Sequence, residues 1–296
     1  MTTAPARLDP RLATLFGRVW PALPAGVARA ETLGFSWAEV STPFGRREGD
    51  RAVAHVGVIE LPLVIAGRSC RVGSIHAACT DPERRGRGLG RALMQEALAA
   101  CRARYDTLVL TTLVPEFYAR LGFRPVREHA FSRPLARSAP ASSCGRALTE
   151  TPGDLRLLRR LLARRAPVSE RLGSREAGTV FVIALLLAWG DFSRVHYHPA
   201  LDTLTVHEVR DGTLVLYDVV APSIPPLEAL AAAIGADADR VITFFAPDRL
   251  GAGFRAEPWD RARAAAMGDD GFAGLMALGP LAGEHDEFML PPLSRT

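Results

Sequence analysis

The sequence predicts a two-domain α/β protein built on mixed sheets, with α and β elements in both halves. Its 296 residues are enough for two ordinary domains, each with its own core. Strand-like stretches alternate with helical ones, and the order of elements in the second half resembles that in the first. Hydrophobic residues make up 48% of the chain and charged residues 23%, which is typical of a folded protein. We therefore expect a duplicated fold.

Turn residues and apolar spacing define the elements of the first half. Two extended runs flank the turn Gly67-Arg68 and predict a hairpin. Apolar residues recur at four-residue spacing from Leu89 to Cys101 and predict a helix. After an initial helical region, the expected elements are strands over 52–66 and 70–80, a helix from 89, a strand over 107–113, a short helix over 116–123 and a closing strand.

A stretch rich in Ser, Ala and Pro, over 134–152, has no apolar period and separates the halves. We place the first domain at 1–135, the linker at 136–150 and the second domain at 151–296. Asp211-Gly212 between two alternating runs predicts a second hairpin. The expected elements are helices over 155–165 and 227–234 and strands over 203–210, 213–220, 240–245, 274–279 and 287–290.

Composition argues against several classes of protein. The apolar run 181–189 is about half as long as a membrane-spanning helix, and residues 1–10 carry no secretory signal, so we expect a cytoplasmic protein without a membrane partner. The net charge is only +4 and the arginines are dispersed, so we do not expect nucleic-acid binding. All 36 Lys+Arg residues are Arg, which excludes lysine Schiff-base chemistry. The four cysteines are Cys70, Cys79, Cys101 and Cys144. They show no metal-ligand spacing, and we expect them to be reduced thiols.

The most informative segment is a loop of Gly and Arg between an expected strand and an expected helix. Glycines let backbone N–H groups approach an anion, and the start of a helix adds unpaired donors. Arginines add charge-assisted contacts to phosphate. The dinucleotide pattern GxGxxG fails because Arg91 or Leu93 stands at its third glycine. The sequence therefore predicts a phosphate-binding loop made of Arg85, Gly86, Arg87, Gly88, Leu89, Gly90 and Arg91.

The pattern [QR]xxGx[GA], filled by Arg85, Gly88 and Gly90, resembles the acetyl-coenzyme A loop of the GCN5-related N-acetyltransferases, the GNAT superfamily. In that family the loop binds the pyrophosphate of the cofactor. A second motif, FYARLGF over 117–123, is similar to the family hallmark FYxxLGF. The resemblance covers roughly residues 10–135. It implies a GNAT fold, acetyl-coenzyme A as co-substrate and a catalytic first domain.

The resemblance also implies direct transfer of the acetyl group to a primary amine. The pantetheine arm would lie along the strand edge Ala78, Cys79 and Thr80, and a backbone N–H of that edge would stabilise the carbonyl oxygen. Tyr118 stands where the family commonly keeps the general acid that protonates the leaving thiolate. An alternative role for Tyr118 is packing against the pantetheine arm.

The amine must lose a proton before it attacks. An alkylamine has a pKa of about 10.4, so its neutral form costs about 4–5 kcal/mol to populate at neutral pH. His76 stands at the offset from the loop where the arylalkylamine acetyltransferases of this superfamily carry a histidine linked to amine deprotonation. Glu60, on the preceding strand and expected to face the crevice, is the other candidate base, and ordered water or a purely structural His76 are alternatives. Cys79 has no base partner at motif spacing, so we expect an edge residue and not a nucleophile.

The second half lacks a counterpart of the loop. After the strand over 213–220 come residues 221–226, with three prolines and no glycine, which cannot cradle a pyrophosphate. A functional unit followed by a degenerate one resembles the tandem acetyltransferases of the mycothiol-synthase and Eis-like type, where the degenerate unit helps to wall the acceptor site. We therefore expect a small-molecule amine acceptor; protein amines, a non-catalytic acyl-coenzyme A sensor and a homo-oligomer stay open. His196 and His198 are interpreted as an exposed turn and not as a metal site.

Overall fold

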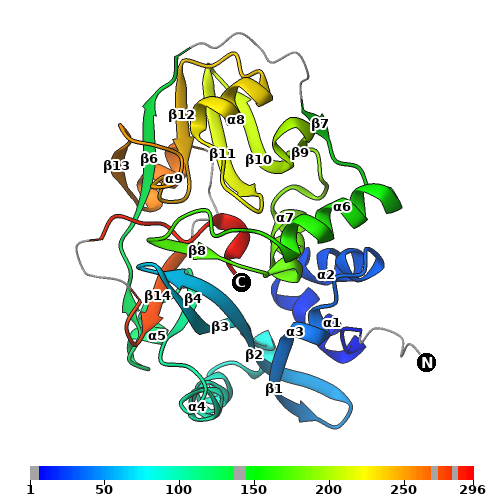
Figure 1. The fold of residues 1–296 in the computed structure, drawn as a ribbon. Coiled ribbons are helices and arrows are strands. Elements are labelled where there is room, and N and C mark those ends of the chain that lie inside the picture. The colour runs from blue at the N-terminus through cyan, green and yellow to red at the C-terminus, as the bar shows by residue number, and fades with distance from the viewer. Residues whose placement is uncertain (1–6, 137–144, 268–272, 282–285) are drawn as a thin grey trace.

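The computed structural model describes residues 7–136, 145–267, 273–281 and 286–296. Its strands form two mixed sheets, one above the other in Figure 1, which confirms the expected α/β class. The helices are α1 (Pro10–Val19), α2 (Leu23–Thr32), α3 (Trp37–Val40), α4 (Leu89–Cys101), α5 (Pro115–Ala119), α6 (Pro152–Ala163), α7 (Gly178–Trp189), α8 (Leu227–Ile234) and α9 (Arg261–Ala266), with short 3-10 turns η1 (Pro82–Arg84), η2 (Pro199–Leu201) and η3 (Pro292–Ser294).

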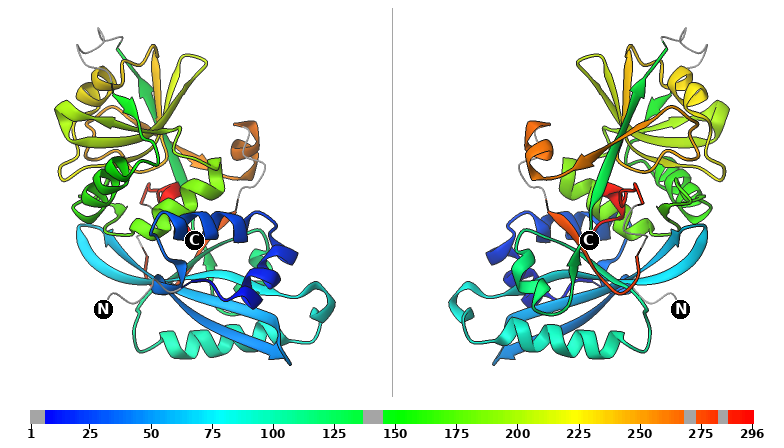
Figure 2. Two further views of the ribbon diagram at one scale, coloured as in Figure 1. Left: turned by 90° about the vertical axis from the view of Figure 1, so that its right-hand side faces the viewer. Right: turned by 90° about the vertical axis from the view of Figure 1, so that its left-hand side faces the viewer.

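The first sheet has the strand order β1-β2-β3-β4-β14-β5, and β8 pairs with β2. Its strands are β1 (Ser41–Glu48), β2 (Arg51–Ile65), β3 (Arg68–Thr80), β4 (Leu108–Thr112), β5 (Arg124–Pro125), β8 (Leu172–Ser174) and β14 (Gly274–Leu278). Successive side chains of β2 point to opposite faces of the sheet. Val56 packs with the α4 side of the core, whereas the His55 ring meets Phe16 of α1 at 5.0 Å between centroids. Helix α4 therefore covers one face, and α1 and α2 cover the other (Figure 2).

The second sheet has the order β13-β6-β12-β11-β10-β9-β7. Its strands are β6 (Glu128–Pro134), β7 (Arg146–Ala147), β9 (Val195–His198), β10 (Thr203–Arg210), β11 (Thr213–Val220), β12 (Arg240–Thr243) and β13 (Arg255–Trp259). The predicted hairpin at Asp211-Gly212 is confirmed, since Arg210 pairs with Thr213. The expected late strand over 287–290 is not a strand. The Phe288 carbonyl oxygen accepts from the His129 backbone N–H, and the Leu290 backbone N–H donates to the Glu128 carboxylate, just before Pro291.

The two sheets exchange strands. β14 lies between β4 and β5 of the first sheet, where Ala277 pairs with Val109 and with Arg124. In return, β6 leaves the first half and lies between β12 and β13 of the second sheet. Sheet membership thus crosses the expected boundary near residue 135, and residues 137–144 of the expected linker lie outside the described residues. The division into a first and a second domain stays a prediction.

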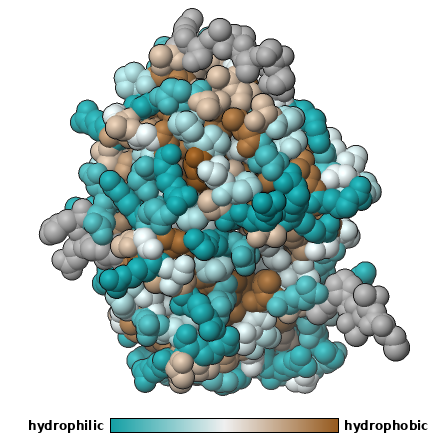
Figure 3. Space-filling model, in the orientation of Figure 1, coloured by the Kyte–Doolittle hydropathy of each residue, from teal (hydrophilic) through white to brown (hydrophobic). Residues whose placement is uncertain are grey.

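The apolar run over 181–189 forms helix α7, which is buried between the halves. Phe181, Val182 and Leu185 are fully covered, and they share one core cluster with α1, α2, α6 and strands of the second sheet. Leu187 lies against Gly26 of α2, because a Cβ built at that glycine would come within 2.8 Å of the leucine side chain. Within the described ranges, the helices are too short or too polar to cross a bilayer. On the face shown in Figure 3, small apolar areas lie among larger hydrophilic ones.

Gly279, directly after β14, tests how much the inserted strand contributes to stability. Its φ is +91°, and a Cβ there would approach the Asp106 carbonyl oxygen to within 2.1 Å. We expect Gly279→Ala to lower the free energy of unfolding by roughly 2–4 kcal/mol, from backbone strain and overlap together. The matched control is Gly67→Ala, at φ +76° with no atom within 4 Å of its Cβ, which should cost only about 1 kcal/mol. Urea unfolding curves measure both, and equal losses would contradict the overlap.

Candidate active site

The site begins where β3 and β4 separate. These parallel strands pair only at Gly73 with Leu108 and at Ser74 with Val109. Beyond Ser74, β3 also carries an irregularity in its pairing with β2, where Ala77 has a φ of +46°. A cavity of about 980 Å³ opens at this point, lined by residues 75–80 of β3, 111–114 at the end of β4, and the loop that leads into α4. The strand edge named by the sequence, Ala78, Cys79 and Thr80, lies on this cavity.

The predicted phosphate loop borders the same cavity. Gly86 and Gly88 have φ values of +76° and +77°, and a Cβ at either would meet no atom within 4 Å. Gly88 is also the N-cap residue of α4 and provides no side-chain cap, so the first backbone N–H groups of this helix have no intrahelical partner. A side chain at these glycines would fill the open space that an anion needs.

Three arginines add positive charge to the loop. The Arg85 Nε donates to the Thr80 carbonyl oxygen at 3.3 Å, which fixes this residue against the end of β3. Arg87 and Arg91 line the cavity and form no ion pair with another residue of the described ranges. The entry to the loop is anchored by Asp81, which accepts from Arg51 at 2.5 Å and from the Glu83 backbone N–H at 3.0 Å. The residues present therefore fit the pyrophosphate of a coenzyme A ester.

Tyr118 and Cys79 both lie on the wall of the cavity. Tyr118, from α5, is 8% exposed, and its ring packs against Phe117 and Phe123. Burial raises the pKa of Tyr118, and the neighbouring Cys79 raises it further, so the phenol is protonated at neutral pH. Among the described residues, none accepts a hydrogen bond from its hydroxyl. Burial also raises the pKa of Cys79 to about 12, which keeps the thiol protonated and unsuited to act as a nucleophile.

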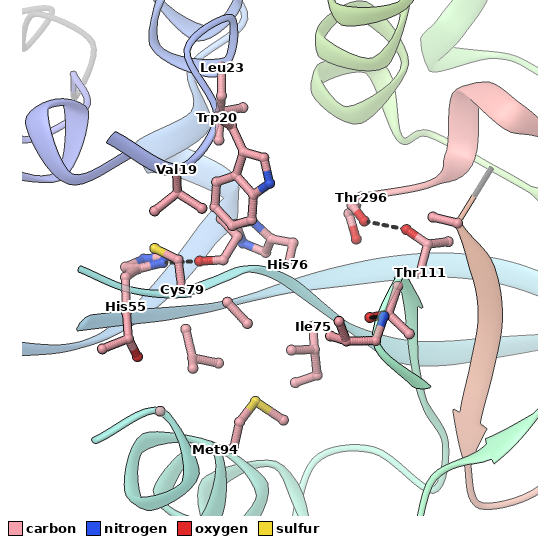
Figure 4. Close-up of a pocket in the computed structure, with 18 of the residues that line it drawn as sticks. Val19, Trp20, Leu23, His55, Ile75, His76, Cys79, Met94, Thr111 and Thr296 are labelled. Atoms are coloured by element: carbon pink, nitrogen blue, oxygen red, sulfur yellow. Dashed lines mark hydrogen bonds between the residues drawn. The ribbon is translucent and has the colours of Figure 1, made fainter. Parts of the chain in front are cut away.

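His76 lies in the same wall of the cavity (Figure 4). Its Nε2 is 2.9 Å from the Ser41 Oγ, and its buried Nδ1 has no hydrogen-bond partner in the described chain. The ring is 3% exposed and meets Trp37 edge-on at 4.5 Å between centroids. Burial, with a smaller contribution from His55, lowers the pKa of His76 to about 3. The imidazole is therefore neutral at physiological pH.

Glu60 is placed elsewhere, on the part of β2 beyond the cavity. Its carboxylate accepts from Arg71 at 2.9 and 2.7 Å and from the Tyr105 hydroxyl at 3.2 Å. The hydrogen bonds from Arg71 lower the pKa of Glu60, and the residue does not line the cavity. The structure thus brings Tyr118, His76 and the loop together but leaves Glu60 out.

Several residues that line the cavity belong to no sequence motif. Val19, Trp20 and Leu23 come from α1 and α2, and Ile183 and Leu187 come from α7 of the second half. The apolar run of α7 could have indicated a buried helix, although not which wall it would form. Thr296 also reaches the cavity: its Oγ1 is 2.5 Å from the Ser74 Oγ, and its backbone oxygen accepts from the Thr111 hydroxyl at 3.1 Å (Figure 4).

The histidines of the second half are not an exposed turn, contrary to expectation. His198 is the last residue of β9 and is 2% exposed, with its Nε2 2.8 Å from the Thr205 Oγ1. The same hydroxyl is 2.8 Å from the Nδ1 of His207. This cluster is packed inside the second half. In the part of the chain that the structure describes, no group of three or more His, Cys, Asp or Glu residues is placed to hold a metal ion.

Comparisons with known proteins agree with this geometry. Residues 32–126 match the family described as an acetyltransferase (GNAT) domain. A GCN5-related N-acetyltransferase from Kribbella flavida has a similar fold, with a TM-score of 0.54 and 20% identity over 90% of this chain and 67% of that one. Eis1 from Mycobacterium abscessus is similar over 86% of this chain and 72% of that one, with a TM-score of 0.54 and 18% identity. No curated protein matches the sequence. The part of the chain that holds the loop and the separated strands is therefore a domain of the GNAT acetyltransferase superfamily.

Proposed function

We propose that this protein transfers an acetyl group from acetyl-coenzyme A to a primary amine of a small molecule. The observation that carries the proposal is the open cradle at Gly86 and Gly88, placed at the mouth of the gap between β3 and β4. An anion bound by the loop would hold the rest of a coenzyme A ester along the gap. Acetyl-coenzyme A would supply the thioester that the amine attacks directly, without a covalent enzyme intermediate.

The residues of the gap provide the binding contacts. The edge of Ala78, Cys79 and Thr80 would bond to the pantetheine arm as an added strand does, and one of its N–H groups would stabilise the carbonyl oxygen. The loop over 85–91 would hold the pyrophosphate through backbone N–H groups and arginines. Both segments lie on one cavity, which supports a single extended ligand.

Tyr118 is suited to protonate the departing thiolate. Its phenol is buried and protonated, and its hydroxyl has no acceptor among the described residues, so the proton is not committed elsewhere. Of the two candidate bases, His76 lines the cavity and Glu60 does not. Burial lowers the pKa of His76 to about 3, so the neutral imidazole is too weak a base to keep the proton of an alkylammonium. We propose that His76 accepts a hydrogen bond from the amine and positions it, and that the proton leaves to solvent water.

A small acceptor is favoured over a protein chain because helix α7 of the second half contributes to the wall of the cavity. Residues of α7 line it together with residues of α1 and α2, which limits the room for an extended protein segment. We propose that the second half is a degenerate GNAT unit with this walling role. The segment that follows β11, residues 221–226, contains three prolines and leads into α8 without a glycine cradle.

The first prediction concerns the cradle. Gly88→Val should weaken binding of coenzyme A at least 100-fold, because a branched side chain would occupy the open space of the loop. Gly67→Val is the matched control, since Gly67 has nearly the same φ, +76° against +77°, and lies in a hairpin turn far along β2. Calorimetry with coenzyme A measures both variants. Tight binding by a folded Gly88→Val protein would refute the pyrophosphate cradle.

The second prediction concerns Tyr118. Tyr118→Phe keeps the ring but removes the proton, so kcat should fall by roughly 100- to 1,000-fold while the Kd of acetyl-coenzyme A changes little. Thiol release with a panel of amines measures kcat, and calorimetry measures Kd. An unchanged kcat would return Tyr118 to a packing role. A wild-type protein that binds acetyl-coenzyme A but releases no thiol with any amine would indicate a sensor.

The third prediction concerns the protonation of His76. Its pKa is depressed in the folded state, so the unfolded chain binds more protons between about pH 6.5 and pH 3, and stability falls as the pH drops through that window. At pH 5 this residue should reduce the free energy of unfolding by about 2 kcal/mol relative to pH 7. The His76 ring signal in NMR, assigned by its absence in His76→Gln, should not titrate between pH 8 and pH 5. A titration midpoint near pH 6.5 would contradict the depressed pKa of His76 and indicate an imidazole in contact with solvent.

A further inference from the structure

The exposed apolar side chains of the described chain are concentrated on the candidate active site. Six large hydrophobic residues are exposed, and five of them line the 980 Å³ cavity. These five are Trp20, Val40, Leu113, Val114 and Leu187. Such side chains are usually scattered singly over a surface, and their collection in one cavity marks a binding site for an apolar group.

The apolar wall of the cavity is built by the end of α1, the start of α2 and one side of α7. Trp20 is 38% exposed and comes from the end of α1, while Leu187 is 41% exposed and comes from α7. Val19, Leu23 and Ile183 add to the same wall, and Figure 4 shows Val19, Trp20 and Leu23 on the side opposite Met94 of α4. Helices from both halves therefore contribute to it.

The charged side chains that line the cavity are all arginines. Among its described lining residues, the charged side chains are Arg84, Arg85, Arg87, Arg91 and Arg295, and none is Asp or Glu. The acidic residues beside the loop are already paired, since Asp81 and Glu83 bind Arg18 and Arg51. An acceptor with several ammonium groups would find no Asp or Glu side chain among these lining residues to pair with them, and burying unpaired charges is costly.

We infer that the acceptor is a monoamine with an apolar, uncharged body, aromatic or alkyl, and not a polyamine or an aminosugar. This inference rests on the proposed function, because it names the substrate class of the same site. Trp20 and Leu187 contact the body of the acceptor, and the lone amine points toward the thioester. An aromatic ring fits beside Trp20, where it would gain area and ring stacking.

The test compares three amines at saturating acetyl-coenzyme A, with thiol release as the readout. 2-Phenylethylamine should show a kcat/KM at least tenfold above that of spermidine and of ethylamine, which has no body to bind. Trp20→Ala should lower kcat/KM for 2-phenylethylamine about tenfold or more and lower that for ethylamine by a much smaller factor. Trp20→Phe should restore most of the loss, and the Kd of coenzyme A should stay constant in both variants.

A charge variant tests the sign of the cavity. Leu187→Glu should raise kcat/KM for spermidine about tenfold, whereas Leu187→Gln, of the same size and uncharged, should not. Spermidine equal to or better than 2-phenylethylamine in the wild type would overturn the inference and leave the transferase function standing. Bound coenzyme A without acetylation of any of the three amines, nor of a wider amine panel, would overturn both proposals.

Discussion

The separation of β3 from β4 is the constraint on which the rest of the site depends. Parallel strands inside a sheet normally continue their hydrogen bonds, but here the pairing stops after Ser74 and Val109. The backbone groups that this leaves unpaired on the edge of β3 need a partner, and an extended ligand can supply one. The same separation brings the loop, Tyr118 and His76 around one cavity. Without it, the glycines at the start of α4 would face no channel.

β3 keeps its pairing with β2 beyond the point where it leaves β4, although the register of that pairing shifts between His55 and Gly57. Ala77 has a left-handed backbone conformation, which is strained for a residue with a Cβ. Its carbonyl oxygen is 2.9 Å from the His55 Nδ1, so a buried side chain of β2 holds the distorted strand in place. His55 thus supports the distorted strand, and both His55 and His76 line the cavity.

Much of the site was predictable because its signals are local. Backbone conformation and helix capping depend on residues that are adjacent in the sequence, so the loop from Arg85 to Arg91 and the helix from Leu89 could be predicted. Tyr118 followed from a motif of similar length. The position of Glu60 could not be read, because its carboxylate is held by Arg71, across the hairpin, and by Tyr105, 45 residues away in the sequence. The contribution of α1 and α7 to the cavity was also hidden, since residues of these helices come together only in the folded chain.

The exchange of strands links the two halves more tightly than a linker would. β14 occupies the gap between β4 and β5, and β6 completes the second sheet, so neither sheet is whole without the other half. During synthesis, the ribosome must deliver almost the entire chain before Gly274 can pair with Thr112. Until then β4 and β5 lack the strand that joins them, so the first sheet is completed only when nearly the whole chain is available. Its last strand is far from its neighbours in the sequence, which makes closure of this sheet slow.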